Sequence, residues 1–98
     1  MSRRFVTRPQ ALKEAFKAAE WYDEQAAGLG ARFLASLDRT IAIIHENPHL
    51  YAAVDDVLRR ARLRGFPYSL IYWFSDEEIV LVACAHWRRN PRRWHGRR

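Results

Sequence analysis

Residues 59–87 read RRARLRGFPYSLIYWFSDEEIVLVACAHW and decide the fold, because their side chains follow the two-residue period of β-strands. In the first part, every second residue is basic, namely Arg60, Arg62 and Arg64. They alternate with Arg59, Ala61 and Leu63. This segment is therefore predicted to be a strand with one basic face, and Gly65 and Pro67 mark a turn or bulge after it.

Two further strands are predicted after this turn. Residues 68–74 are rich in aromatic and β-branched side chains, which favour strands. Residues 79–87 are apolar at nearly every position, as expected of a central strand that is covered on both faces. Because short turns join the three strands, the second of them at Ser75–Glu78, we expect an antiparallel meander.

Two helices are predicted before the meander. Apolar residues recur at steps of three and four, and residues 7–10 (TRPQ) have the pattern of a capping box with proline in the first turn. The apolar stripe comprises Leu12, Ala15, Phe16, Ala19, Tyr22, Ala26 and Leu29. This helix is predicted to end around Gly28 and Gly30, and the next one, with an apolar stripe from Phe33 to Ile44, to stop at Asn47-Pro48.

A short edge strand or extended lead-in at residues 3–7 completes the order β-α-α-β-β-β. The predicted fold class is α+β, a single domain over residues 1–98 with a helical hairpin packed on one face of a small, largely antiparallel sheet. Residues 48–56 are expected to form a loop. The other face of the sheet is left for Arg60, Arg62, Arg64 and a basic C-terminal segment, residues 86–98.

The composition excludes several classes of protein. At 98 residues the chain has the size of one small domain, with 49% apolar and 29% charged residues, as is ordinary for a globular protein. The single cysteine, Cys84, cannot form an intramolecular disulfide, and no Cys/His spacing matches a zinc site, so we expect a reduced, cytoplasmic protein without metal or cofactor. The longest apolar run, Ile79–Ala85, is far shorter than the roughly 20 residues that span a bilayer, so no membrane contact is expected.

The net charge of +6 is distributed unevenly. Residues 9–47 carry four cations and six acidic residues, whereas residues 86–98 carry six arginines and no acidic residue. Arginines 59–64 form a second cluster. Since a planar guanidinium group suits phosphate and carboxylate, these clusters predict a nucleic acid or an acidic protein partner, and a solvated basic surface is the alternative.

Residues 86–94 (HWRRNPRRW) form the most unusual stretch of the chain. His86 can act as an acid or base, arginines such as Arg88 and Arg89 can hold a phosphate, and Trp94 can stack on a base. These are the components of a metal-independent phosphodiester site. In the structural alternative, Trp87 and Trp94 close a small core and His86 is a strand-end residue.

A second candidate lies at the Gly65 turn, which would place Arg64 and Tyr68 beside the end of the next strand. The Tyr68 hydroxyl could contact a phosphate, whereas Tyr72 is predicted to pack in the core. The other histidines, His45, His49 and His95, have no carboxylate or serine at a spacing that suits nucleophilic catalysis and are interpreted as structural.

The chain resembles the RelE/ParE toxins of bacterial toxin-antitoxin pairs, also described as plasmid stabilisation proteins. The resemblance covers almost the whole chain and is carried by Ala18-Ala19-Glu20-Trp21-Tyr22, Ile44-His45-Glu46-Asn47-Pro48, residues 64–72 (RGFPYSLIY), and His86-Trp87-Arg88-Arg89-Asn90-Pro91 with Trp94. It implies a small β-α-α-β-β-β domain that is held inactive by an antitoxin whose C-terminal segment wraps it. A toxin-antitoxin hetero-oligomer is expected on the same ground.

The resemblance implies two possible activities. The RelE branch cuts messenger RNA on the ribosome with Arg and Lys on the sheet and a Tyr near the C-terminus, whereas the ParE branch is associated with inhibition of DNA gyrase. Ser69 stands where the RelE branch carries a catalytic Arg, and Trp94 where its terminal Tyr stands. Ser69 cannot stabilise a pentacovalent phosphate as an arginine does, and Trp94 has no hydroxyl that could donate or accept a proton. Arg88, however, matches a basic position that is retained from the RelE branch. The Phe66-Pro67-Tyr68 motif and the C-terminal motif are similar to those of the ParE branch.

The first hypothesis is therefore a ParE-like toxin that inhibits growth by binding a protein target, DNA gyrase, and that is not an enzyme. The rival is a ribosome-dependent messenger RNA endoribonuclease with Arg62, Arg64, Arg88 and His86 as candidate RNA-binding or catalytic residues. A third hypothesis is a degenerate, non-toxic family member that only binds its antitoxin. The residues expected to bind the target or a nucleic acid are Arg60, Arg62, Arg64, Tyr68, His86, Arg88, Arg89 and Trp94.

Overall fold

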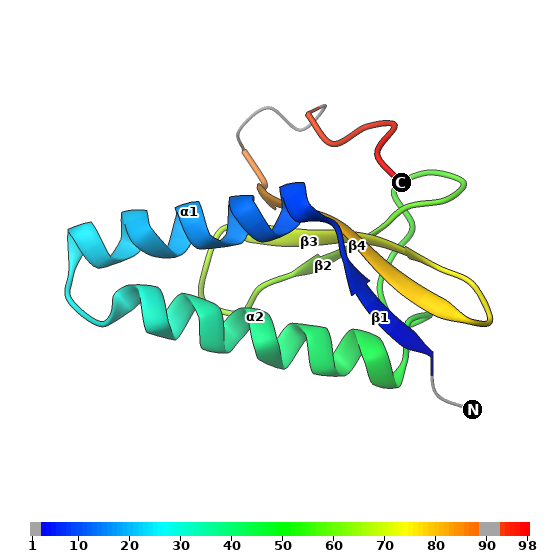
Figure 1. Ribbon diagram of the computed structural model, residues 1–98, viewed down its shortest axis with the longest axis horizontal. Helices are drawn as coiled ribbons and strands as arrows, with labels where there is room; N and C mark the ends of the chain where they lie inside the picture. Colours follow the sequence, from blue (N-terminus) through cyan, green and yellow to red (C-terminus); the bar gives the residue numbers. More distant parts are fainter. Residues whose placement is uncertain (1–2, 89–92) are drawn as a thin grey trace.

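Within residues 3–88 and 93–98, which this computed structural model describes, the helices and strands follow the predicted order β-α-α-β-β-β (Figure 1). They are β1 (Arg4–Thr7), α1 (Pro9–Gln25), α2 (Leu29–Glu46), β2 (Arg59–Arg62), β3 (Tyr68–Phe74) and β4 (Glu78–His86). The α+β fold class is therefore confirmed.

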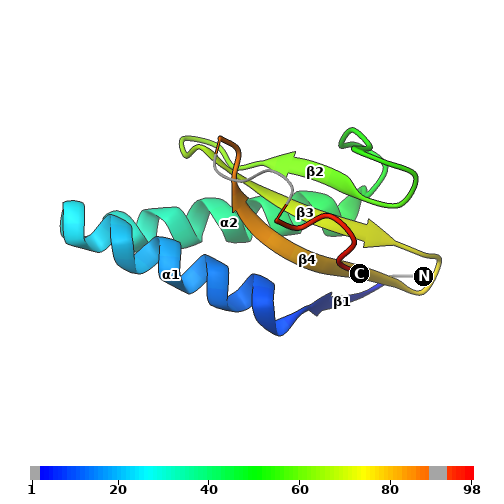
Figure 2. The same ribbon diagram turned by 90° about the horizontal axis from the view of Figure 1, so that it is seen from above.

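The strands form one sheet in the order β1-β4-β3-β2. β2, β3 and β4 form the antiparallel meander that the sequence predicts, and β1 joins β4 in parallel. The β3–β4 register shifts between Ile71 and Tyr72. β1 pairs only with Glu78 to Leu81, the first part of β4, so the described residues place no strand beside the rest of β4 on that side (Figure 2).

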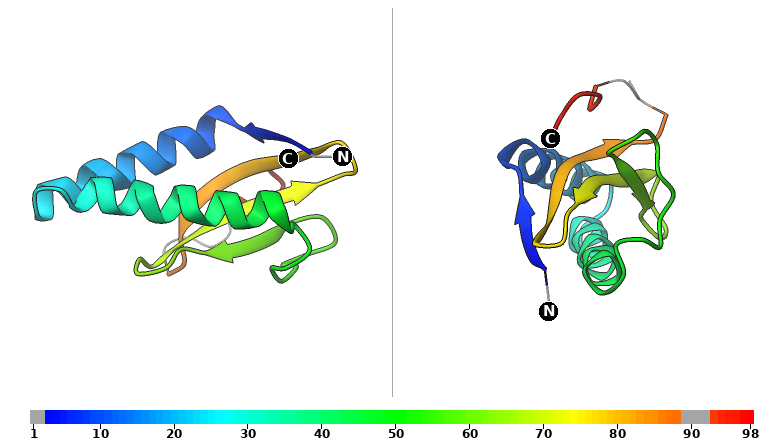
Figure 3. Two further views of the ribbon diagram at one scale, coloured as in Figure 1. Left: turned by 90° about the horizontal axis from the view of Figure 1, so that it is seen from below. Right: turned by 90° about the vertical axis from the view of Figure 1, so that its right-hand side faces the viewer.

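The helices form an antiparallel hairpin on one face of the sheet (Figure 3). Gly28 has a φ of 87°, a left-handed conformation that glycine adopts without strain, and it joins the two helices. A Cβ on Gly30 would clash with the backbone oxygen of Ala19, and the Gly30 N–H donates to the Asp23 carboxylate (2.7 Å). The hairpin is therefore closely packed at its turn. No helix in the described ranges is long and apolar enough to cross a membrane.

The predicted details of α1 are partly wrong. Its buried face consists of small residues, namely Ala11, Ala15, Ala18 and Ala19. Leu12 and Phe16, expected in the buried stripe, are instead 48% and 56% exposed. Alanines let the helix lie close against β4, and the larger side chains then face away. The capping box is also not formed, because Thr7 still belongs to β1 and the N-cap is Arg8, which makes no side-chain capping bond.

The second face of the sheet carries an apolar cluster that periodicity only partly indicated. Its members are Leu58, Ile71, Val80, Val82, Ala83 and Trp94. The loop between α2 and β2 and the C-terminal segment therefore cover this face, on the other side of the sheet from α2 (Figure 3). The prediction that β4 is covered on both faces is confirmed. The exposed arginines Arg60 and Arg62 lie on the β2 side of this face.

Tyr72 packs in the core, as predicted. It is fully buried, and its hydroxyl donates a hydrogen bond to the backbone oxygen of Pro48 (2.7 Å). Burial raises the pKa of Tyr72 to about 12 from an ordinary value of 10.0. The bond joins β3 to the end of α2, which is where the predicted Asn47-Pro48 stop lies.

Tyr72→Phe should lower the free energy of unfolding by about 1 to 2 kcal/mol, because the Pro48 oxygen loses its buried donor. In the wild type, stability should also fall as pH rises from about 10 to 12, since the unfolded chain ionises Tyr72 before the folded chain does. The variant should lose less stability in this range. Urea denaturation at several pH values measures both effects. At neutral pH, Tyr51→Phe is the control, because no hydrogen bond of the Tyr51 hydroxyl is seen among the described residues, and an equal loss there would contradict the assignment.

Candidate functional site

The predicted arginines of β2 and of the turn after it point into solvent. Arg60, Arg62 and Arg64 are exposed, whereas the residues between them are buried in the core on the helix side. Since side chains alternate along a strand, Arg60 and Arg62 project from the face of the sheet opposite the helices. The two ion pairs among the described residues involve none of these arginines.

Arg59 has a different environment from its neighbours. Its guanidinium donates to the backbone oxygens of Tyr51 (2.6 Å) and His49 (3.3 Å), and it lies over the Phe74 ring, 5.4 Å from the centroid. Arg59 therefore fastens the loop before β2 to the sheet and is not available to a ligand in this structure.

Trp87 brings two basic side chains together at the end of β4. The guanidinium carbons of Arg88 and Arg62 lie 4.4 and 5.5 Å from its ring centroid, within the range of cation–π attraction. The backbone N–H of Trp87 donates to the backbone oxygen of Pro67 (3.0 Å), and the indole ring is 39% exposed. We call Arg60, Arg62, Trp87 and Arg88 the Arg/Trp surface.

Tyr68 and His86 lie side by side, and His86 also lines a small crevice with Arg60. They are register partners on β3 and β4, and their rings meet edge to face at 5.2 Å. Tyr68 also packs against Tyr22 and Phe33, so it belongs to the helix side of the sheet. His86 Nδ1 accepts a hydrogen bond from the Arg88 N–H (3.1 Å), which leaves the proton of a neutral ring on Nε2.

The remaining residues that were predicted to bind a target or a nucleic acid are Trp94, Arg64 and Arg89. Trp94 is only 6% exposed, because it packs in the apolar cluster on the second face of the sheet, as the structural alternative expected. Arg64 lies in the turn before β3, where its backbone oxygen accepts from Ser36 (2.8 Å). Arg89 lies outside the described residues. The structure thus brings together Arg62, Trp87 and Arg88 rather than the whole set.

Ser69, the residue that stands in place of a catalytic arginine of the RelE branch, is 1% exposed. Its hydroxyl has no hydrogen-bond partner among the described residues. A crevice of about 10 Å³ beside it is shared with Arg60 and Trp94, which leaves room for little more than one water molecule. Ser69 is therefore not placed to touch a phosphate.

A larger groove of about 240 Å³ lies between α1 and the end of β4. We call it the edge groove; its lining includes Glu14, Lys17, Trp21, Cys84, His86 and Trp94. Burial, assisted by the Glu14 carboxylate, raises the pKa of the Cys84 thiol to about 12, so the thiol is not an activated nucleophile. No group of three or more potential metal ligands occurs in the parts of the chain that the structure describes.

The outward side of α1 was missed as a candidate surface. Leu12 and Phe16 are one helical turn apart and both exposed, and we call them the apolar helix face. The sequence contained a signal for it, because Ala11 and Ala18 join Ala15 and Ala19 in a second, all-alanine stripe that can face the sheet in place of Leu12 and Phe16. Exposed large apolar side chains in a group are typical of interaction sites.

A family model and a solved structure both match this chain. The family model described as ParE toxin of type II toxin-antitoxin system, parDE, matches residues 5–91. A solved structure described as the chromosomal ParDE TA system from P. aeruginosa contains a chain with the same fold, with a TM-score of 0.76 and 10% sequence identity. The alignment covers 87% of this chain and 96% of that one. No curated protein matches the sequence significantly.

The two C-terminal tryptophans should respond differently to truncation. Trp94→Ala should lower the free energy of unfolding by about 3 kcal/mol or more, because it empties a buried site. Trp87→Ala should cost about 1 kcal/mol or less, because the ring is exposed and contributes mainly cation–π contacts. Denaturation followed by circular dichroism compares them. An equal cost would show that Trp87 is part of the core and is not free to contact a partner.

Proposed function

Because this chain belongs to the ParE toxin family of type II toxin-antitoxin systems, we propose that it arrests bacterial growth by binding a protein target, DNA gyrase, and that a cognate antitoxin neutralises it. The family match over residues 5–91 carries the toxin-antitoxin assignment. The choice of gyrase rests on the likeness of the Phe66-Pro67-Tyr68 motif and the C-terminal motif to the ParE branch, and a cytoplasmic site of action on the single cysteine of the chain.

The Arg/Trp surface supports a target that is bound rather than cut. Arginine and tryptophan are the residues most enriched among those that dominate protein–protein binding energy. Arg62 and Arg88 are partly ordered by stacking on Trp87, so a partner's carboxylates would find them oriented. No acidic residue among the described ones competes for their charge.

The ribonuclease alternative receives less support from the geometry. A general base must lie within hydrogen-bond reach of the proton that it takes. Here His86 Nδ1 is already engaged by the Arg88 N–H, and Arg64 lies in a turn tied to α2. Ser69 is buried where a phosphate-stabilising side chain would be needed.

The apolar helix face suits the antitoxin that the family implies. An amphipathic segment can bury apolar side chains against Leu12 and Phe16, with Lys13 and Lys17 nearby to meet its acidic residues. This face is on the helices, whereas Arg60 and Arg62 project from the opposite face of the sheet. We therefore assign the two partners to different surfaces and expect a toxin-antitoxin hetero-oligomer.

The cellular target can be tested by inducing the chain without its antitoxin and pulse-labelling DNA and protein synthesis over the first minutes. Gyrase inhibition predicts that DNA synthesis falls first, because supercoiling is required for replication. An earlier fall in translation would contradict the proposal and favour the ribosome-dependent nuclease. Growth without arrest would instead identify a non-toxic, antitoxin-binding member.

The two surfaces can be separated by charge substitutions. Arg62→Glu with Arg88→Glu should reduce toxicity roughly tenfold or more and leave antitoxin binding unchanged, since charge reversal at a central contact opposes binding. Phe16→Glu should do the reverse and yield a toxin that the antitoxin no longer neutralises. Arg39→Glu, an exposed change on α2, is the matched control for altered charge. Loss of both properties in either variant, with stability retained, would argue against two surfaces.

A further inference from the structure

Along the second half of β4, the edge on the β1 side is contacted by side chains instead of by a neighbouring strand. β1 ends opposite Leu81. Beyond that point, the Cys84 N–H donates to the carboxylate of Glu14 on α1 (3.1 Å). The Val82 oxygen accepts from the guanidinium of Arg97 (3.3 Å), and Arg97 also donates to the same Glu14 oxygen (2.9 Å). One carboxylate and one guanidinium thus satisfy two backbone groups on the open edge of the strand.

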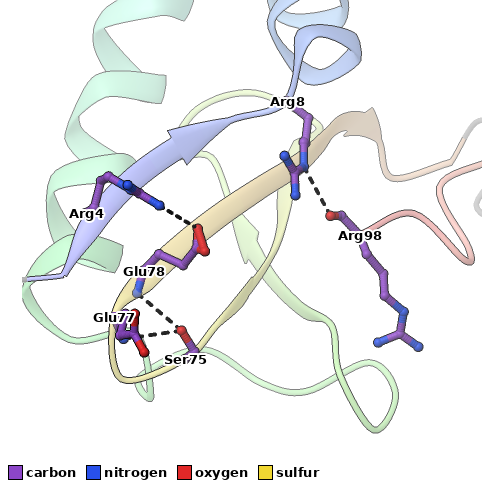
Figure 4. A network of polar contacts seen from close by, with 6 residues as sticks. All are labelled: Arg4, Arg8, Ser75, Glu77, Glu78 and Arg98. Atoms are coloured by element: carbon purple, nitrogen blue, oxygen red, sulfur yellow. Dashed lines mark hydrogen bonds and ion pairs between the residues drawn. The ribbon is translucent and has the colours of Figure 1, made fainter.

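The C-terminal residues that supply Arg97 cross β4 on its outer side (Figure 2). We call residues 93–98 the strap. Its Trp94 ring enters the apolar cluster of the second face, and its Arg98 backbone oxygen accepts from the Arg8 side chain (3.1 Å; Figure 4). With the Arg97–Glu14 pair, these contacts fasten the strap at three places.

The Arg97–Glu14 pair is the polar connection between the strap and α1. The two side chains are 15% and 23% exposed, so the pair is partly shielded from water. If Arg97 leaves, Glu14 and the Val82 oxygen both lose a partner in a poorly hydrated place. The remaining strap residues Arg93, His95 and Gly96 are exposed and add little burial. The strap is therefore held mainly by the burial of one side chain, Trp94, and by the Arg97–Glu14 pair.

The strap also forms one wall of the edge groove. Arg93 and Trp94 line the groove together with Lys17 and Trp21 of α1 and with Cys84. The thiol is 3% exposed while the strap is in place. Cys84 is the single cysteine of the chain, so any reagent that reacts with a thiol reports on this one position.

We propose that the strap is a gate that opens over the edge of β4 without global unfolding, and that the Arg97–Glu14 pair is its latch. Segments held by few buried contacts open locally at a lower free energy than the whole fold. In the open state the Val82 oxygen loses its Arg97 donor, and the edge groove beside Cys84 loses one wall. In the closed state the strap shields this edge.

The reaction of Cys84 with 5,5′-dithiobis(2-nitrobenzoate) in the native full-length chain tests the gate. Arg97→Ala should accelerate labelling about tenfold or more, because opening no longer breaks a charged hydrogen bond. Arg98→Ala is the matched control: it removes a neighbouring arginine side chain but keeps the backbone oxygen that contacts Arg8. It should label at the wild-type rate.

Tyr72→Phe separates local from global opening, since it lowers overall stability without touching the strap. Under the proposal its labelling rate in the absence of denaturant equals that of the wild type, and low urea concentrations change the rate little. Two results would overturn the proposal. One is an Arg97→Ala rate no higher than that of Arg98→Ala; the other is an equal acceleration by Tyr72→Phe, which would mean that Cys84 reacts only after global unfolding.

Discussion

Burial of β4 on both faces requires two apolar layers, and the rest of the chain supplies them. The helical hairpin provides one layer, with alanines on α1 that allow close contact. The loop before β2 and the Trp94 ring provide the other. The polar edge of the same strand is satisfied by β1 over its first part and by Glu14 and Arg97 over the rest. Both candidate binding surfaces are left outside this packed centre.

The sequence predicted those parts of the fold that depend on local periodicity. The alternation at Arg60 and Arg62 and the continuous apolar run of β4 identified the meander and its basic side correctly. Periodicity could not determine the rotation of α1, because the choice between Ala11 and Leu12 as the buried residue depends on how close the helix lies to β4. The Glu14–Arg97 pair joins distant parts of the chain, and no local pattern indicates it.

The candidate site was predicted in composition but not in arrangement. Arg62 and Arg88 were both singled out as binding residues, whereas Trp87 was expected only as a possible core residue. Their association depends on a cross-strand placement that only the assembled sheet provides. Trp94 and Arg59 have the same residue types and are used to hold the structure together. Residue type in a basic, aromatic segment therefore indicates an interaction surface, whereas burial decides which members belong to it.

The parallel pairing of β1 with β4 has a consequence for the order of folding. The first strand of the chain finds its partner only at Glu78 to Leu81, after both helices and two other strands have been synthesised. Closing so long a stretch of chain is entropically costly and slow. On the ribosome, the helical hairpin therefore emerges with no sheet to cover its apolar stripe. The residues of the apolar helix face on α1 are therefore synthesised first, whereas the sheet and its Arg/Trp surface form only late in synthesis.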